Sequence, residues 1–280
     1  MSLTAPVNRI LPYSVVDGPG NRCAIFFQSC NLHCAYCHNP ETQRLCTDCG
    51  ECVDGCPAGA LSASGAGVAW DAGRCVNCDR CIKVCPHRAS PKVRWMTPED
   101  VLAKVSESVP FIRGISTSGG ECGLYPAFLE RLYGMVHEIG LTCLMDSNGT
   151  IDLSLYPGLM AVCDGVMLDV KAWDAGVFRG LTGGDVSVVK RNLSFLADEG
   201  KLEEIRIVTL DGYMDAERCV EGIAEVLGPE LTRHQTLKLI RFRPFGVRGE
   251  LERELPPTME RMRRLADMAA SMGFEDIRII

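Results

Sequence analysis

The sequence predicts an α/β protein, an open partial (β/α)6 TIM-like barrel with a small cysteine-rich module inserted after its first strand. Apolar strand-like runs alternate with segments of helical periodicity, which is the pattern of a parallel sheet with crossover helices. Six strand–helix repeats are too few for a closed eight-stranded barrel. Residues 43–95 interrupt the alternation with cysteine, glycine and proline. We therefore expect three parts: residues 1–42 with the first strand and a cysteine loop, the insert at 43–95, and the remaining barrel at 96–280.

The strands are expected where short apolar runs are bounded by turn residues. They are Ala24 to Gln28, Ile112 to Thr117, Leu141 to Met145, Gly165 to Val170, Glu204 to Leu210 and Thr236 to Phe242, with an edge strand at Ile277 to Ile280. Helices are expected at Pro98 to Glu107, Ala127 to Ile139, Leu153 to Val162, Val186 to Glu199, Asp215 to Leu227 and Met259 to Met272. Thr97 is a capping residue for the first of these, because Pro98 and Asp100 suit a first helical turn. Functional side chains are expected at the carboxyl ends of the strands.

Composition narrows the class of protein. The chain has 280 residues, 46% of them apolar, and a net charge of -7, which argues against a nucleic-acid partner. The first 22 residues contain no continuous apolar stretch, so neither a signal peptide nor a membrane span is expected. Sixteen cysteines without an export signal indicate metal binding in a reducing compartment, and we expect a cytoplasmic enzyme.

One cysteine cluster is a ligand short of filling an iron–sulfur cube. Cys30, Cys34 and Cys37 have the spacing C-x-x-x-C-x-x-C, whereas a 4Fe-4S cube normally takes four thiolates. Three ligands leave one iron with open coordination, as a catalytic metal site requires. A group from outside the protein is expected to bind there.

Two further clusters are complete. Each repeats the run C-x-x-C-x-x-C-x-x-x-C-P of two-cluster bacterial ferredoxins. In that arrangement the fourth cysteine of each run binds the other cluster. One set is then Cys46, Cys49, Cys52 and Cys85, and the other is Cys75, Cys78, Cys81 and Cys56. Closed clusters of this kind suit electron transfer, and the insert is therefore expected to be a ferredoxin-like domain with two 4Fe-4S clusters.

The cysteine loop and its flanks carry a family resemblance. The segment from Cys30 to Cys37, C-N-L-H-C-A-Y-C, resembles the signature of the radical S-adenosylmethionine (SAM) superfamily, with the usual aromatic residue, Tyr36, before the last cysteine. The D-G-P-G segment from Asp17 and the H-N-P segment from His38 resemble the glycyl-radical enzyme activating enzymes, such as the pyruvate formate-lyase activating enzyme. The insert resembles the subset with ferredoxin domains, and the whole chain looks most similar to the YjjW-type activases.

The resemblance implies a reaction and its partners. SAM chelates the open iron through its amine and carboxylate, and an electron from the cluster cleaves the sulfonium C–S bond. The resulting 5'-deoxyadenosyl radical abstracts hydrogen from a glycine of a partner glycyl radical enzyme. Three 4Fe-4S clusters, SAM, and flavodoxin or ferredoxin as electron donor are thus expected of this oxidoreductase, with the protein orienting the cofactor against its target.

The second strand is followed by Gly119, Gly120 and Glu121. Two residues without side chains there suggest that backbone approaches a ligand closely, and Glu121 then lies where it can meet an ammonium group. These residues match the family's G-G-E motif, which contacts the SAM amine. An ordinary strand-to-helix turn is the alternative for so short a motif.

The third and fourth strands also end in polar residues. Asp146, Ser147 and Asn148 close the third strand, and Asp169 and Lys171 close the fourth. In the activating-enzyme family the matching carboxylates hold a monovalent cation beside SAM, and the lysine contacts SAM. Oxygen ligands suit such a hard cation. Structural salt bridges are the competing interpretation.

Three further positions complete the predicted site. Arg206 lies within the apolar fifth strand, where a charge usually has a partner or ligand, and the family carries a SAM-binding arginine here. Asp17 matches a segment that approaches the partner's glycine loop, although a simple turn explains D-G-P-G equally well. The histidine that the best-known activases place near the ribose is absent, and Arg243 is the only substitute we can suggest.

Two other functions remain open on the sequence. A radical SAM enzyme could act on a small molecule, and the chain could be an electron-transfer protein whose barrel is only a scaffold. The second alternative leaves the open iron and the G-G-E segment unexplained. The two ferredoxin-like clusters could relay electrons to the SAM cluster or could be structural.

Overall fold

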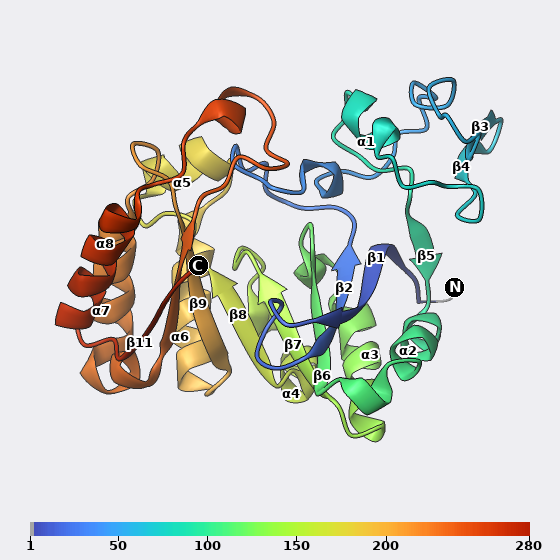
Figure 1. Cartoon of the computed structure of the whole chain (residues 1–280). Coiled ribbons are helices and arrows are strands. Elements are labelled where there is room, and N and C mark those ends of the chain that lie inside the picture. Colours follow the sequence, from blue (N-terminus) through green and yellow to red (C-terminus); the bar gives the residue numbers. More distant parts are fainter. Residues whose placement is uncertain (1–2) are drawn as a thin grey trace.

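A single mostly parallel sheet organises the computed structural model, which describes residues 3–280 (Figure 1). Its nine strands have the order β11-β10-β9-β8-β7-β6-β2-β1-β5. From β2 to β11 every neighbouring pair is parallel, whereas β1 pairs antiparallel with both β2 and β5. The strands are β1 (Ala5–Ser14), β2 (Arg22–Phe27), β5 (Arg94–Met96), β6 (Gly114–Gly119), β7 (Thr142–Ser147), β8 (Gly165–Asp169), β9 (Leu202–Thr209), β10 (Thr236–Arg241) and β11 (Asp276–Ile279). Within the described part of the chain the sheet ends at β11 and β5, so it is open as expected.

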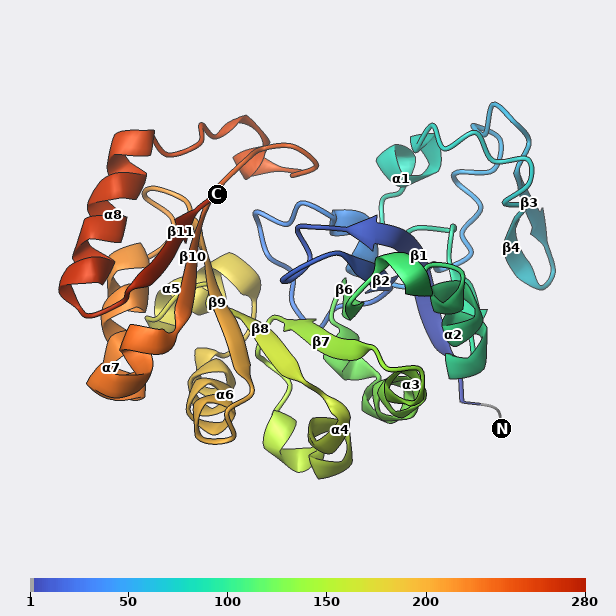
Figure 2. The ribbon, with the colours of Figure 1, turned by 60° about the horizontal axis from the view of Figure 1, so that its bottom comes forward.

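The helices cover the outer side of this curved sheet, and the concave side faces the cysteine loop (Figure 2). They are α2 (Pro98–Ser106), α3 (Pro126–Glu138), α4 (Pro157–Val162), α5 (Ala175–Thr182), α6 (Val186–Asp198), α7 (Ala216–His234) and α8 (Met259–Ser271). Apolar side chains of both layers form one core, in which Phe27, Phe128 and Phe178 are fully or almost fully buried. Thr97 caps α2 in a complete capping box with Asp100, as the sequence predicts.

All seven predicted strands are present within two residues of their expected bounds. The helix expected at Asp215 to Leu227 is also correct up to Leu227. Gly228, with a φ of 69°, and Pro229 then produce a kink, and the helix continues beyond it to His234. The helix expected from Leu153 begins instead as a short 3-10 turn, Leu153–Leu155, and becomes regular only after Pro157.

Two elements near the site were missed. Strand β1 was not expected, because Pro6 and Pro12 argue against a central strand, but it carries an irregular register with bulges along β2. Helix α5 contains Gly176 and Gly180, which weaken a helical pattern, and it depends on Asp174, whose side chain accepts hydrogen bonds from the backbone N–H groups of Gly176 and Val177.

The β1–β2 connection turns back over the concave face of the sheet. Gly18 has a φ of 114° and packs against Leu144 and Met167, where a Cβ atom would lie 3.1 Å and 3.3 Å from their side chains. The buried Arg22 donates to the carbonyl oxygens of Ile115 and Thr142, which fixes the start of β2 to the next strands. This connection therefore forms one wall below the site.

The insert has little regular structure. It contains a hairpin of β3 (Leu61–Ser64) and β4 (Gly67–Trp70), which forms its own two-stranded sheet, and a short helix α1 (Arg80–Val84). It lies beyond the β1–β5 edge of the main sheet (Figure 1), and β5 joins its end to that edge. Residues 1 and 2, the start of the predicted first part, lie outside the described residues.

Among residues 3–280, no helix combines the length and the apolar composition that a membrane crossing requires.

Candidate active site at the carboxyl ends of the strands

One cavity collects nearly all the predicted site residues. It has a volume of about 180 Å³ and lies between the cysteine loop and the carboxyl ends of β6, β7 and β8. Its lining includes Cys30, Cys34, Tyr36, Cys37, Gly119, Gly120, Glu121, Asp146, Ser147, Asn148, Asp169 and Lys171. Leu32, His38, Ser118 and Val208 also line it and were not predicted as site residues. The three cysteines and the polar strand ends are thus brought together as the sequence predicts.

Backbone hydrogen bonds on both sides fix the cysteine loop. The N–H groups of Ser29 and Cys30 donate to Thr42 and Gln43 at 2.8 Å and 3.0 Å. Further along, His33 and Ala35 donate to the carbonyl groups at the end of α5. The loop is therefore anchored independently of any bound group, which orders its three thiols around one space.

The two glycines after β6 make room for the backbone of this loop. A Cβ on Gly119 would lie 2.2 Å from the carbonyl oxygen of Phe27, and a Cβ on Gly120 would lie 2.0 Å from that of Ser29. Gly119 also has a φ of 120°, which L side chains rarely adopt. Both glycines line the cavity, and their missing side chains also make room for the backbone that leads into Cys30.

Glu121 is buried and already holds three hydrogen bonds. Its Oε1 accepts from the backbone N–H of Gly123 at 2.9 Å and from the Ser147 hydroxyl at 3.0 Å, and its Oε2 accepts from the backbone N–H of Asn148 at 2.8 Å. Burial raises its pKa to about 7 despite these donors. Because an ionised carboxylate can accept about four hydrogen bonds, one position remains for a donor in the cavity.

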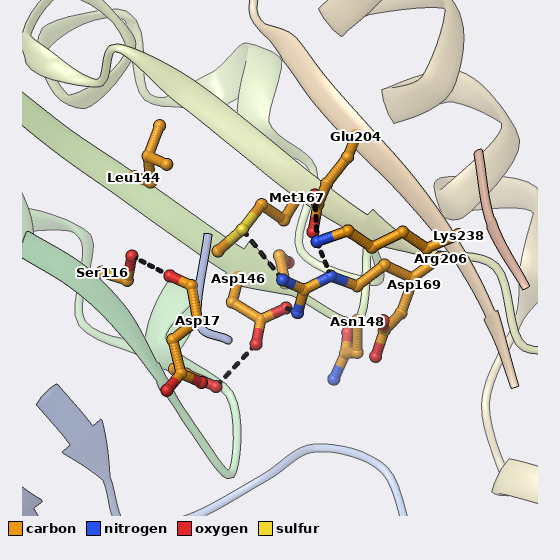
Figure 3. Close-up of polar contacts among 12 residues, drawn as sticks. Asp17, Ser116, Leu144, Asp146, Asn148, Met167, Asp169, Glu204, Arg206 and Lys238 are labelled. Atoms are coloured by element: carbon orange, nitrogen blue, oxygen red, sulfur yellow. Dashed lines mark hydrogen bonds and ion pairs between the residues drawn. The ribbon is translucent and has the colours of Figure 1, made fainter. Parts of the chain in front are cut away.

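A chain of charged side chains crosses the concave face from β7 to β10 (Figure 3). The Arg206 guanidinium contacts Asp146 at 3.0 Å and Glu204 at 2.5 Å, and Lys238 contacts Glu204 at 2.5 Å. The second oxygen of Asp146 accepts from the Ser118 hydroxyl at 2.8 Å. Arg206 does not line the cavity itself, and it contacts the two carboxylates and the Met167 sulfur, so this charge within an apolar strand has partners as the sequence predicts. Glu204 and Lys238 were missed, although charged residues inside apolar strands were a visible signal.

Asp169 and Lys171 form a second ion pair, with a nitrogen–oxygen distance of 2.7 Å. The Lys171 ammonium lies 5.9 Å from the centre of the Tyr36 ring. Burial raises the pKa of Asp146, the Arg206 charge lowers it, and the charges of Asp169 and Asp17 raise it. These three carboxylates therefore share one region, and each competes for positive charge.

Asp17 lies at the rim of this region. Its side chain accepts a hydrogen bond from the Ser14 hydroxyl at 2.5 Å, and its backbone carbonyl accepts one from Ser116 (Figure 3). Arg243, suggested above for the ribose, is exposed and does not line the cavity. His38, which begins the H-N-P segment noted in the sequence, lines it instead.

The donor set fits an iron–sulfur cluster and a polar ligand. Burial raises the pKa of Cys30 to about 12 and that of Cys34 to about 11, so both remain neutral thiols until a metal ion stabilises the thiolate. Three buried polar atoms near the cysteines, the Tyr36 hydroxyl, His38 Nε2 and Gln43 Nε2, have no hydrogen-bond partner among residues 3–280. Buried polar groups normally have partners, so these atoms suit bound polar groups.

The insert brings cysteines of its two runs close together. A smaller cavity is lined by Cys56 together with Cys75, Cys78 and Cys81. Burial is the main cause of the raised pKa of the Cys46 and Cys52 thiols, and the nearby Cys85 raises both pKa values further. The fourth cysteine of each run thus lies beside the other run.

An open, mostly parallel α/β sheet with a three-cysteine loop at its strand ends defines the class of the radical SAM enzymes. Residues 24–220 match the family model of the Radical SAM superfamily, and the chain belongs to this superfamily. A Haemophilus influenzae protein, provisionally named a glycyl-radical enzyme activating enzyme, is 29% identical over 98% of this chain and 96% of its own length. The indoleacetate decarboxylase activating enzyme of Tractidigestivibacter scatoligenes is 27% identical over 98% of this chain and 97% of its own. Among solved structures, QueE from Escherichia coli has a TM-score of 0.57 at 15% identity, covering 99% of this chain and 94% of QueE, which shows the shared fold.

Proposed function

We propose that this protein is a glycyl-radical enzyme activating enzyme, an oxidoreductase that cleaves SAM and generates a radical on a glycine of a partner enzyme. The observation that carries the proposal is the single cavity that joins the three-cysteine loop to Glu121 and to the polar ends of β7 and β8. The names of the relatives that match nearly the whole chain support the same activity. When bound, the cluster and SAM supply a 5'-deoxyadenosyl radical that removes hydrogen from the glycine.

The chain's own residues hold and orient these groups. Cys30, Cys34 and Cys37 would hold a 4Fe-4S cluster with one ligand fewer than it normally takes, which would leave it able to bind SAM. Glu121 offers its remaining acceptor position to the SAM amine. Tyr36 contributes a buried aromatic face to the same cavity.

The charged residues around the cavity balance the ligand's own charges. Lys171 and Arg206 supply positive charge for the SAM carboxylate, each of them now paired with an aspartate. Once the two cations turn to the ligand, Asp146 and Asp169 retain negative charge that a monovalent cation can neutralise. Ser147 and Asn148 keep Glu121 in place between these groups.

The insert is proposed to be a ferredoxin-like domain of the YjjW type with two closed 4Fe-4S clusters, which brings the total to three. Cys46, Cys49, Cys52 and Cys85 hold one, and Cys75, Cys78, Cys81 and Cys56 hold the other. The cavity lined by Cys56 with the second run, and the closeness of Cys85 to the first, support this crossed assignment. The insert then receives electrons from a flavodoxin or ferredoxin. So many metal-binding thiols suit a reducing compartment, and a cytoplasmic location is part of the proposal.

The partner's glycine loop is proposed to enter along the concave face beside Asp17. Val15 and Val16 next to it are each 75% exposed, so an apolar surface is available to a partner there. The test uses a candidate glycyl radical enzyme deuterated at the α-carbon of glycine, incubated with the reduced protein and SAM. Deuterium in 5'-deoxyadenosine together with a glycyl radical EPR signal supports the proposal. Deuterium transfer only from a labelled small metabolite would contradict it.

A further inference from the structure

Two buried carboxamides lie beside the cysteine loop. Asn148 lies at the end of β7 and is 6% exposed, and Gln43 follows the loop in the chain and is 4% exposed. Each side chain ends in a strong hydrogen-bond donor, and burying that donor without an acceptor would cost free energy. Each buried amide is therefore expected to have a hydrogen-bond acceptor nearby.

Asn148 donates toward Cys30. Its Nδ2 lies 3.7 Å from the Cys30 Sγ and 3.0 Å from the Asn31 Oδ1. Its Oδ1 accepts from the backbone N–H and the hydroxyl of Thr150 at 2.9 Å and 2.6 Å. Two donors on the oxygen and an acceptor at the nitrogen fix which way the amide points. The Cys30 sulfur also accepts from the backbone N–H of Leu32 at 3.4 Å.

Gln43 acts on Cys37. Its Nε2 is buried and makes no hydrogen bond within residues 3–280. The Gln43 side chain lies close to the Cys37 thiol. Its backbone carbonyl accepts from the Cys30 N–H at 3.0 Å, which ties its position to the cysteine loop. A neutral thiol is a weak acceptor, whereas a thiolate completes the hydrogen bond that this amide lacks.

We propose that Gln43 and Asn148 each donate a side-chain hydrogen bond to a thiolate of the SAM-binding cluster, at Cys37 and Cys30, and thereby raise its reduction potential. The inference rests on the proposed function, because it assumes that these cysteines ligate a cluster. Both residues are positioning residues for electron transfer, acting through the cluster ligands.

The direction follows from electrostatics. A hydrogen bond to a charged acceptor stabilises the charged form, and the reduced cluster carries one more negative charge than the oxidised cluster. Hydrogen bonds to the sulfurs are among the levers that set the potential of such clusters. Because the site is buried, each donor counts for more than it would in water. Two of the three ligands therefore receive an amide donor from outside the loop's own backbone.

The test substitutes the donors without removing bulk. Gln43→Met keeps the length of the side chain, and Asn148→Leu keeps its approximate volume. Gln28→Met is the matched control: Gln28 is a fully buried carboxamide of the same region, and its Nε2 donates at 2.6 Å to the carbonyls of Glu41 and Arg44, not to sulfur. Anaerobic redox titrations of the holoenzymes follow the EPR signal that changes on adding SAM, which isolates this cluster from the closed ones.

The proposal predicts a more negative midpoint potential for Gln43→Met and for Asn148→Leu, an additive shift in the double variant, and no shift in Gln28→Met. Unchanged potentials in fully loaded Gln43 and Asn148 variants would overturn it. So would an equal shift in the Gln28 variant, because loop packing would then explain the effect.

A second measurement uses only the wild-type protein. ENDOR spectra of the reduced wild-type SAM-responsive cluster in H2O and D2O should show exchangeable proton couplings, and ¹⁵N labelling restricted to glutamine or asparagine side chains should show nitrogen coupling from each. Absence of both amide nitrogen couplings would contradict the inference while leaving the function intact. If wild-type protein holds no SAM-responsive cluster, the proposed function and this inference both fail.

Discussion

The backbone N–H of Asn148 donates a 2.8 Å hydrogen bond to the carboxylate of Glu121, which joins the end of β7 to the end of β6. The Ser147 hydroxyl donates to the same carboxylate at 3.0 Å. Glu121 and the pair that begins at Ser147, which are 26 positions apart in the sequence, thus act as one unit at the cavity wall. A change in the charge of Glu121 therefore alters the hydrogen bonds that join the end of β6 to the end of β7.

The burial of Glu121 predicts a pH-dependent affinity for SAM. Its pKa is raised to about 7, so below pH 7 the carboxyl group is protonated, and the amine of SAM must displace that proton. Affinity should therefore weaken as the pH falls through 7, by up to about tenfold per pH unit. Calorimetry at pH 6 and pH 8 on wild type and Glu121→Gln checks this.

The SAM amine titrates equally for both proteins, so the difference between them isolates Glu121. We expect weaker binding by the Glu121→Gln variant at pH 8 and a smaller change between the two pH values. Parallel pH profiles for the two proteins would show that Glu121 does not change its protonation on binding.

The Arg206 ion pairs predict a large loss of stability in Arg206→Met. The side chain is 8% exposed, and its removal leaves Asp146 and Glu204 with less compensation for buried negative charge. Breaking a buried pair in this way costs about 3–5 kcal/mol. The exposed pair of Arg278 and Asp276 is the control, and Arg278→Met should cost less than about 1 kcal/mol. Similar urea midpoints for the two variants would refute the structural role of Arg206.

The contact between Gly120 and Ser29 predicts that Gly120→Ala disturbs the cysteine loop. The new Cβ would lie 2.0 Å from the Ser29 carbonyl oxygen, so the backbone before Cys30 has to move. We expect loss of the SAM-responsive EPR signal with the other clusters retained. Gly134→Ala in α3 meets no atom within 4 Å and should stabilise the protein by up to about 1 kcal/mol. A normal SAM-responsive signal in Gly120→Ala would contradict the assigned role.

The crossed ligand sets of the insert predict how iron content responds to paired substitutions. Cys56 lines one cavity with Cys75, so Cys56→Ser and the double variant with Cys75→Ser should both lose about four of about twelve irons. Combining Cys56→Ser with Cys49→Ser should instead remove about eight. Iron and sulfide analysis after anaerobic reconstitution distinguishes these values, and the reversed order would assign each run to its own cluster.

The sequence predicted the parallel strands well because their apolar runs are short and bounded by turn residues. It also placed Glu121, Asp146 and Asp169 correctly, since side chains at the ends of neighbouring parallel strands must converge. Helix α5 was missed because its two glycines hide its periodicity, although it anchors the cysteine loop through two backbone carbonyls.

Partners within the site could not be predicted in the same way. Arg206 was expected to have a partner or a ligand, but its particular partners, Asp146 and Glu204, follow from strand register, which is a property of the folded sheet. Gln43 belongs to no sequence motif, and only the folded structure shows that it is buried beside Cys37. The absence of a side chain at Gly120 was recognised in the sequence, but its close contact with the Ser29 carbonyl oxygen is a property of the folded loop.

The central claim is that Cys30, Cys34 and Cys37 hold a cluster that cleaves SAM. The most direct measurement is the formation of 5'-deoxyadenosine by anaerobically reconstituted, dithionite-reduced protein supplied with SAM, with a Cys34→Ala variant that retains the clusters of the insert. Formation by wild type and not by Cys34→Ala is the predicted result. Equal formation by both proteins, or none by a wild type that carries all its clusters and its partner enzyme, would contradict the claim.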